Sequence, residues 1–184
     1  MKKFLAILCA MVLLLATMAT ALANPSISDL STTAAEAEGL AEGTSIAVTE
    51  AKADEYTGAV ADIVKNVNEG DEPYTVEQAL TDLDKTDVLA DAASYDFVTN
   101  FAELTLSQGD EVVVDEEGNI AVKVTLTIDA LKGVAEADLA NYKLLVVNPT
   151  TSDVAVLDLT AVDLAAGQVS AEFPFLGVFA LIQK

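Results

Sequence analysis

Apolar and polar residues alternate along much of the chain beyond Tyr95, and this period of two constrains the fold more than any other sequence feature. In the clearest run, 120–128, isoleucine, valine and leucine alternate with alanine, lysine and threonine. A strand with one buried and one wet face is typical of antiparallel sheets. Further strands are expected at 102–106, 112–114, 142–147, 154–162 and 169–175. The run 176–182 is almost continuously apolar, which predicts a strand buried on both faces.

Turn residues separate these runs and predict short connections. Glycine and short polar side chains at 107–110 and 115–119 suit a turn and a hairpin loop. Turns are also expected at 148–150 and 165–167, and a longer connection with a helical turn is expected at 130–141. Six or more strands joined in this way predict a mainly β fold.

Two amphipathic helices are predicted before the strands. The acidic residues Asp54 and Glu55 would favour the N-terminal end of a helix dipole. Apolar residues then recur at three- and four-residue steps, at Tyr56, Ala59, Val60, Ile63, Val64 and Val67. A second, shorter helix is expected to begin at Thr75, whose hydroxyl and the Gln78 side chain form a capping-box pattern. Its apolar side consists of Val76, Ala79, Leu80 and Leu83.

The pattern as a whole predicts an antiparallel β-sandwich with an N-terminal helical segment. Because the helices could instead pack on one end or face of a single sheet, an α+β fold is the alternative. We expect a flexible lead-in at 24–43, a helical segment that packs on the sheet at 44–94, with a short strand at 44–49, and a β-sandwich domain at 95–184.

The N-terminus predicts export. Lys2 and Lys3 precede an apolar stretch at 4–15, and small residues at Ala21 and Ala23 match the positions that a signal peptidase recognises. Residues 1–23 are therefore predicted to be a signal peptide cleaved after Ala23, which leaves a secreted chain. The alternative is an uncleaved anchor, but the apolar stretch is short for a hydrocarbon core of ~30 Å.

Composition excludes several classes of partner. The chain has 30 acidic and 9 basic residues, every basic residue is lysine, and the net charge is −21. Such a chain repels phosphate backbones and anionic lipids, so binding to nucleic acid or to a membrane surface is not expected. No stable membrane insertion is expected after signal cleavage either. The 52% content of hydrophobic residues is too high for an acidic disordered chain.

The side chains needed for most catalysis are missing. The sequence has no histidine, and signal cleavage would remove its single cysteine, Cys9. Ser–His–Asp triads, Cys–His dyads and the usual zinc, copper and haem ligand sets then cannot form. We therefore predict no enzyme, no catalytic, cofactor-binding or metal-binding residues, and no cofactor. A hydrolase that uses only two carboxylates is the exception, but the 30 acidic residues single out no pair.

Calcium is the inorganic ligand that an acidic composition favours, because it binds several oxygens. The candidate clusters are 66–72 and 115–119. A calcium-binding loop counted from Asn66 places Glu77 at its twelfth position, but Asp71 stands where glycine is required. The second cluster also fits a hairpin turn. Calcium is kept as an alternative partner.

Four segments near the C-terminus, at 142–147, 154–162, 167–173 and 175–182, form one further pattern. They resemble the terminal strands of β-sandwich modules in secreted and cell-surface proteins of Gram-positive bacteria. Those modules often close with a Ser-Pro-Phe-Ala-hydrophobic-like strand, which Val178-Phe179-Ala180-Leu181 resembles without the Ser-Pro. The resemblance implies display, spacing or adhesion, although no cell-wall sorting pattern precedes Lys184.

The predicted function is that of a secreted, non-catalytic acidic β-domain, acting in extracellular interaction or as a structural module. Its expected partner is an unknown extracellular protein. A calcium- or glycan-binding protein is the alternative, followed by a carboxylate-only hydrolase.

Overall fold

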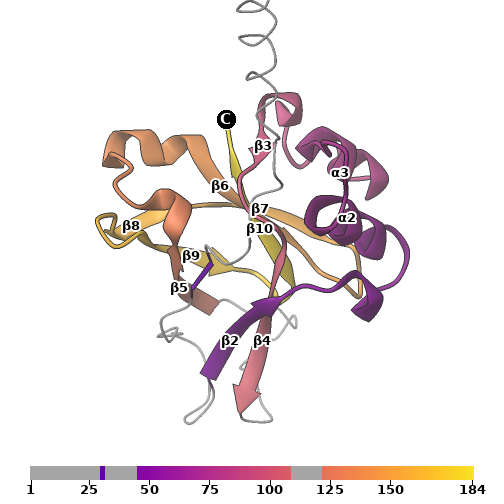
Figure 1. The fold of residues 1–184 in the computed structure, drawn as a ribbon, viewed down its shortest axis with the longest axis horizontal. Coiled ribbons are helices and arrows are strands. Elements are labelled where there is room, and N and C mark those ends of the chain that lie inside the picture. The colour runs from indigo at the N-terminus through magenta and orange to yellow at the C-terminus, as the bar shows by residue number, and fades with distance from the viewer. Residues whose placement is uncertain (1–29, 32–44, 109–121) are drawn as a thin grey trace, which may run out of the picture.

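The computed structural model describes residues 30–31, 45–108 and 122–184 (Figure 1). The strands are β1 (Leu30–Ser31), β2 (Ser45–Glu50), β3 (Asp96–Phe97), β4 (Ala102–Gln108), β5 (Val122–Ile128), β6 (Tyr142–Val147), β7 (Val154–Asp158), β8 (Thr160–Asp163), β9 (Gln168–Phe173) and β10 (Val178–Gln183). The α-helices are α2 (Gly58–Asn68) and α3 (Val76–Asp82). Short 3₁₀ turns are η2 (Ala53–Glu55), η3 (Ala92–Ser94), η4 (Asp129–Leu131) and η5 (Glu136–Asn141).

The strands form two antiparallel sheets. One has the order β1-β5-β9-β8, and the other has the order β2-β4-β10-β6-β7, with β3 added beside β10. Every strand pairing is antiparallel. The prediction of a mainly β chain with antiparallel sheets and a helical segment is confirmed.

A core of buried side chains lies between the two sheets. We call it the inter-sheet core; its largest members are Leu126, Ile128, Leu131, Leu144, Phe173, Phe179 and Leu181. The rings of Phe173 on β9 and Phe179 on β10 meet edge to face, with centroids 5.7 Å apart. Both sheets thus contribute side chains to one buried core.

A second core lies between the helices and the other face of the β10 sheet, and Figure 1 shows α2 and α3 on that side. This helix-side core contains Val60, Ile63, Val64, Leu80, Phe101, Leu145, Val147, Val178, Ala180 and Ile182. Successive side chains of a strand point to opposite faces, so β10 supplies both cores, and its residues 178–182 are all fully buried. The predicted strand with two buried faces is confirmed.

The helix α2 begins later than its apolar pattern suggested. Asp54 and Glu55 lie in η2, and Thr57 is the N-cap, so neither carboxylate is in the first turn of the helix. The chain turns at Gly58, whose φ of 63° is left-handed and favours glycine. The predicted dipole contribution of the two acidic residues is therefore wrong. The buried stripe of Val60, Ile63, Val64 and Val67 is as predicted.

The helix α3 matches its sequence pattern. The Thr75 hydroxyl accepts a hydrogen bond from the backbone N–H of Gln78 at 3.2 Å. The Gln78 side-chain oxygen accepts one from the backbone N–H of Thr75 at 2.8 Å. The capping box is confirmed, and the apolar side of the helix is buried.

The bounds of two predicted strands differ clearly in the structure. The run 154–162 is not one strand: β7 pairs with β6, and after Leu159 the chain crosses to the other sheet, where β8 pairs with β9. The strand β4 extends to Gln108, into the predicted turn at 107–110. The predicted strand at 112–114 and hairpin loop at 115–119 lie outside the described residues.

The predicted segment boundary near residue 94 is untested, but β2, from the helical segment, is hydrogen-bonded to β4 throughout its length. The end of α2 is also tied to this sheet. The Asn68 side chain donates to the backbone oxygens of Ala51 and Phe101, each at 3.0 Å, and accepts from the N–H of Phe101 at 2.7 Å. Among the described residues, no helix is long and apolar enough to cross a membrane.

Candidate functional site

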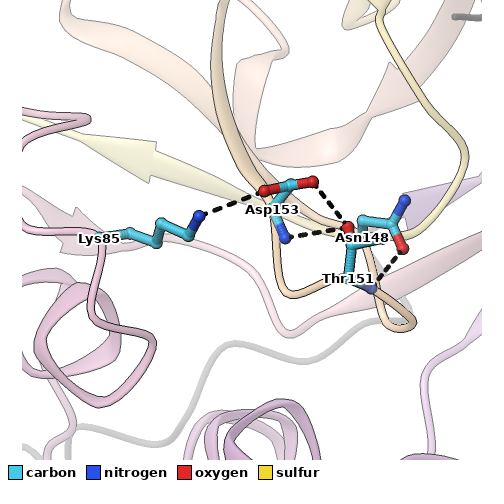
Figure 2. Close-up of polar contacts among 4 residues, drawn as sticks. All are labelled: Lys85, Asn148, Thr151 and Asp153. Carbon is cyan, nitrogen blue, oxygen red and sulfur yellow. Dashed lines mark hydrogen bonds and ion pairs between the residues drawn. The ribbon is translucent and has the colours of Figure 1, made fainter.

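A polar cluster occupies the turn between β6 and β7 (Figure 2). The side-chain oxygen of Asn148 accepts hydrogen bonds from the backbone N–H groups of Thr150 at 2.9 Å and Thr151 at 3.2 Å. The Thr151 hydroxyl donates to the carboxylate of Asp153 at 2.8 Å. The predicted turn is confirmed, and its side chains fix the direction in which β7 begins.

Asp153 also connects this turn to the helical layer. Its Oδ1 lies 3.2 Å from Nζ of Lys85, which follows α3 and is 68 residues away in sequence. The Thr151 hydroxyl, and then Lys85, hold the pKa of Asp153 below its usual range. Both carboxylate oxygens of Asp153 therefore have partners within the chain. These contacts hold the start of β7 beside the helical layer. No local sequence pattern pointed to the Lys85–Asp153 contact.

The strand β7 is the most open apolar segment near this cluster. It pairs with β6 on one side, from Val154 to Asp158, and no described strand pairs with its other side. The side chains of 154–157 are all only partly buried, although none is charged. Valines 154 and 156 contact the helix-side core, while Leu157 contacts the inter-sheet core. An apolar strand edge is thus exposed on an acidic molecule.

A hollow of about 320 Å³ runs beside this edge. The hollow lies between the end of β7 and β9. The polar residues that line it are Lys123, Asp158, Thr160, Ser170 and Glu172. Lys123 and Glu172 are cross-strand neighbours on β5 and β9. Among the described residues Lys123 forms no ion pair, whereas Asp158 pairs with Lys143.

A second hollow of about 360 Å³ lies on the other side of the crossing between β7 and β8. It shares Asp158 and Thr160 with the first and adds Tyr142 and Glu136.

Two other tyrosines, Tyr56 and Tyr74, pack against the helix-side core, where burial is the main cause that raises the pKa of each phenol.

A third hollow of about 530 Å³ lies beside α2 and is lined mainly by charged residues. Lys52 and Lys65 line it together with Asp54, Asp62 and Glu69. Neither lysine forms an ion pair with a described residue. The two signs of charge are mixed around this hollow, so it favours no single class of ion.

Of the two predicted calcium clusters, only 66–72 lies within the described residues. Both ends of the Asn68 amide are already bonded to the backbone of Ala51 and Phe101, so its oxygen serves the fold. No group of three or more acidic side chains suited to a metal ion occurs among the described residues. The cluster at 115–119 lies outside them, and calcium binding stays a prediction.

Comparison of the chain with protein-family models, with curated proteins and with solved structures gives no match. The resemblance to surface modules of Gram-positive bacteria therefore remains an expectation from the sequence.

Proposed function

We propose that this chain is a secreted, non-catalytic acidic β-domain that acts by binding another extracellular protein. The observation that carries the proposal is the open edge of β7, uncharged from 154 to 157, on a chain whose net charge is −21. Open strand edges pair readily with other chains, and folded proteins usually protect them. The signal-peptide pattern of residues 1–23, and a composition without histidine or arginine, support an exported binding role.

The first test is export. When the full chain is produced in a Gram-positive host, we expect it in the culture medium with Asn24 as its first residue. N-terminal sequencing checks the cleavage site. Recovery in the membrane fraction with Met1 or Lys2 intact would contradict the proposal and favour the uncleaved anchor.

The second test is binding. The secreted chain, immobilised, is incubated with cell-surface and extracellular fractions of the producing bacterium, beside an unrelated secreted protein of equal net charge. We expect one retained protein that binds the purified chain with a measurable Kd. If nothing is retained beyond what the charge-matched control retains, the interaction role is wrong and a structural role without a partner remains.

A glycan-binding function is a second candidate, favoured by the hollow that holds Tyr142 beside Asp158 and Thr160. An aromatic face with adjacent oxygen groups is a combination suited to sugars. Thermal unfolding with a panel of oligosaccharides tests it, because a ligand that binds only the folded form raises Tm, and raises it further as its concentration increases. Parallel samples with calcium and with a chelator test the metal alternative, and unchanged Tm values would remove both.

A further inference from the structure

The backbone groups on the open edge of β7 can be assigned from its pairing with β6. The N–H of Asn148 donates to the carbonyl of Asp153 at 2.8 Å, which makes these two residues a hydrogen-bonded pair. Bonded and non-bonded pairs alternate along an antiparallel ladder. In the observed register, the backbone groups of Val154, Val156 and Asp158 therefore point away from β6, toward the open side.

This edge lacks the features that protect other edges of the molecule. In β8 the register shifts between Ala161 and Asp163, so the bulged residue Val162 interrupts the ladder. In the pair of β2 and β4 the register also shifts, between Ser45 and Ile46, with Ser107 of β4 as the extra residue. Bulges, lysines and prolines are the usual means by which proteins block edge pairing. The residues of β7 from 154 to 157 include none of them, and the register with β6 is regular.

Charge and space indicate the kind of segment that fits. The hollow of about 320 Å³ beside Val156, Leu157 and Asp158 leaves room for the side chains of an added strand. The hollow carries mixed charge, because Lys123 lines it beside Glu172 and beside Asp158, whose side chain is 89% exposed and pairs with Lys143. With a net charge of −21, a second copy of the chain is repelled, while a cationic segment is attracted.

We propose that β7 binds an extended segment of another extracellular protein in which lysine or arginine alternates with small apolar residues. The segment adds as a strand beside Val154, Val156 and Asp158, and its basic side chains approach Asp158 and Glu172. This inference rests on the proposed function and specifies its surface and its partner.

The peptide acetyl-Lys-Val-Lys-Val-Lys-Val-amide is the probe. Its binding to the secreted chain is measured by calorimetry beside a peptide with glutamate in place of lysine. We expect the lysine peptide to bind at least about tenfold more tightly, with an affinity that falls as salt rises. Equal binding of the two peptides would overturn the cationic preference.

Backbone methylation separates strand addition from charge attraction alone. Two further peptides carry N-methyl groups on either the valine amides or the lysine amides, because only one of these sets faces β7. We expect one methylated peptide to lose about tenfold or more in affinity and the other to bind like the parent. Equal affinities for the two methylated peptides would overturn strand addition.

Val156→Pro is the matching change in the protein, since it removes an outward N–H without removing a bond to β6. Val156→Thr keeps that N–H and the shape of the side chain. We expect about a tenfold loss of peptide affinity for V156P and little change for V156T. Hydrogen exchange on the unmodified chain gives a readout that does not depend on whether V156P folds. We expect the backbone amides of Val154 and Val156 to exchange more slowly when the peptide is bound.

These outcomes distinguish the two proposals. If the retained surface protein binds V156P and V156T equally well, β7 is not its docking site, although the interaction role stands. Unchanged exchange at Val154 and Val156 leads to the same conclusion. A salt-stable dimer in light scattering would overturn the choice of a basic partner in favour of a second copy.

Discussion

Asn68 joins helix and sheet through a side chain that uses its donor and its acceptor at once. Its three hydrogen bonds reach Ala51 and Phe101, which flank the pairing of β2 with β4. Asn68→Ala leaves these backbone groups without partners, at a cost of about 3 kcal/mol in the free energy of unfolding. Urea denaturation measures it, and a change below about 0.5 kcal/mol would contradict this role.

Asn68→Asp is the matched control. It keeps an oxygen for the N–H of Phe101, but it removes the donor to the two carbonyls and brings a carboxylate against them. We expect a destabilised protein here too, because the carbonyls of Ala51 and Phe101 lose their donor and face a negative charge.

Asp153 provides a residue-scale test of electrostatics. Its pKa is lowered first by the Thr151 hydroxyl and then by Lys85, so Thr151→Val should raise the pKa toward its usual value. A folded-state pKa below the unfolded value of about 3.9 adds stability above that pH. That stability is lost as the pH falls below about 4 and through the folded-state pKa.

Carbon-13 NMR titration of the Asp153 carboxyl group measures this change directly. Lys85→Met is the companion variant, and we expect it also to raise the pKa of Asp153, because it removes both the hydrogen bond and the positive charge of the lysine. A larger effect of Lys85→Met would show that the ion pair dominates over the hydroxyl.

At the scale of elements, the turn between β8 and β9 depends on Gly167. Its φ is 75°, and a Cβ atom there would lie 2.5 Å from the carbonyl oxygen of Ile128. Gly133 has a similar φ of 76° with nothing within 4 Å of an added Cβ, so the two glycines differ only in the clash.

Gly133→Ala should therefore cost only the left-handed strain, about 1–2 kcal/mol. Gly167→Ala should cost more, because the backbone of β5 would also have to move. Thermal unfolding of the two variants compares them. Equal losses would mean that the turn relaxes freely and that the carbonyl of Ile128 imposes no constraint.

The sequence pattern located elements better than it located their partners. Alternation identified β5 because it records which residues are buried. It did not show that the chain changes sheet at Leu159, because apolar residues continue on both sides of that point. The sequence pattern places the start of α2 too early. The apolar spacing continues back to Tyr56, whereas the helix begins only after the chain turns at Gly58.

The candidate site was less predictable than the fold. The contact of Lys85 with Asp153 spans 68 residues, and each side chain looks like an ordinary surface charge in the sequence. The side of β7 that faces away from β6 is open because β7 is the last strand of its sheet, and the order of strands in a sheet is not visible in a local sequence pattern. Only the turn at Asn148 had a local pattern that could be recognised.

At the scale of the whole molecule, the net charge of −21 outweighs the few attractive pairs. The described residues contain four salt bridges, and each includes an exposed or half-exposed partner. Such pairs contribute little, whereas the excess of like charges favours expansion.

Added salt should therefore stabilise the fold. The screening length falls from about 30 Å at 0.01 M to about 3 Å at 1 M. We expect Tm to rise over this range in potassium chloride at pH 7, and to rise less at pH 4, where many carboxylates are protonated. A Tm that falls with salt would mean that the attractive pairs dominate.

The position of β10 has a consequence for the order of assembly. This strand lies between β4 and β6, yet it follows both in the sequence and supplies side chains to both cores. A polypeptide that emerges N-terminus first cannot join the β2–β4 ribbon to the β6–β7 hairpin until residue 183 has emerged. This sheet therefore closes only when the C-terminal strand is available. On the proposed route of export, this late closure keeps the precursor unfolded until its C-terminal strand has passed through the translocation channel.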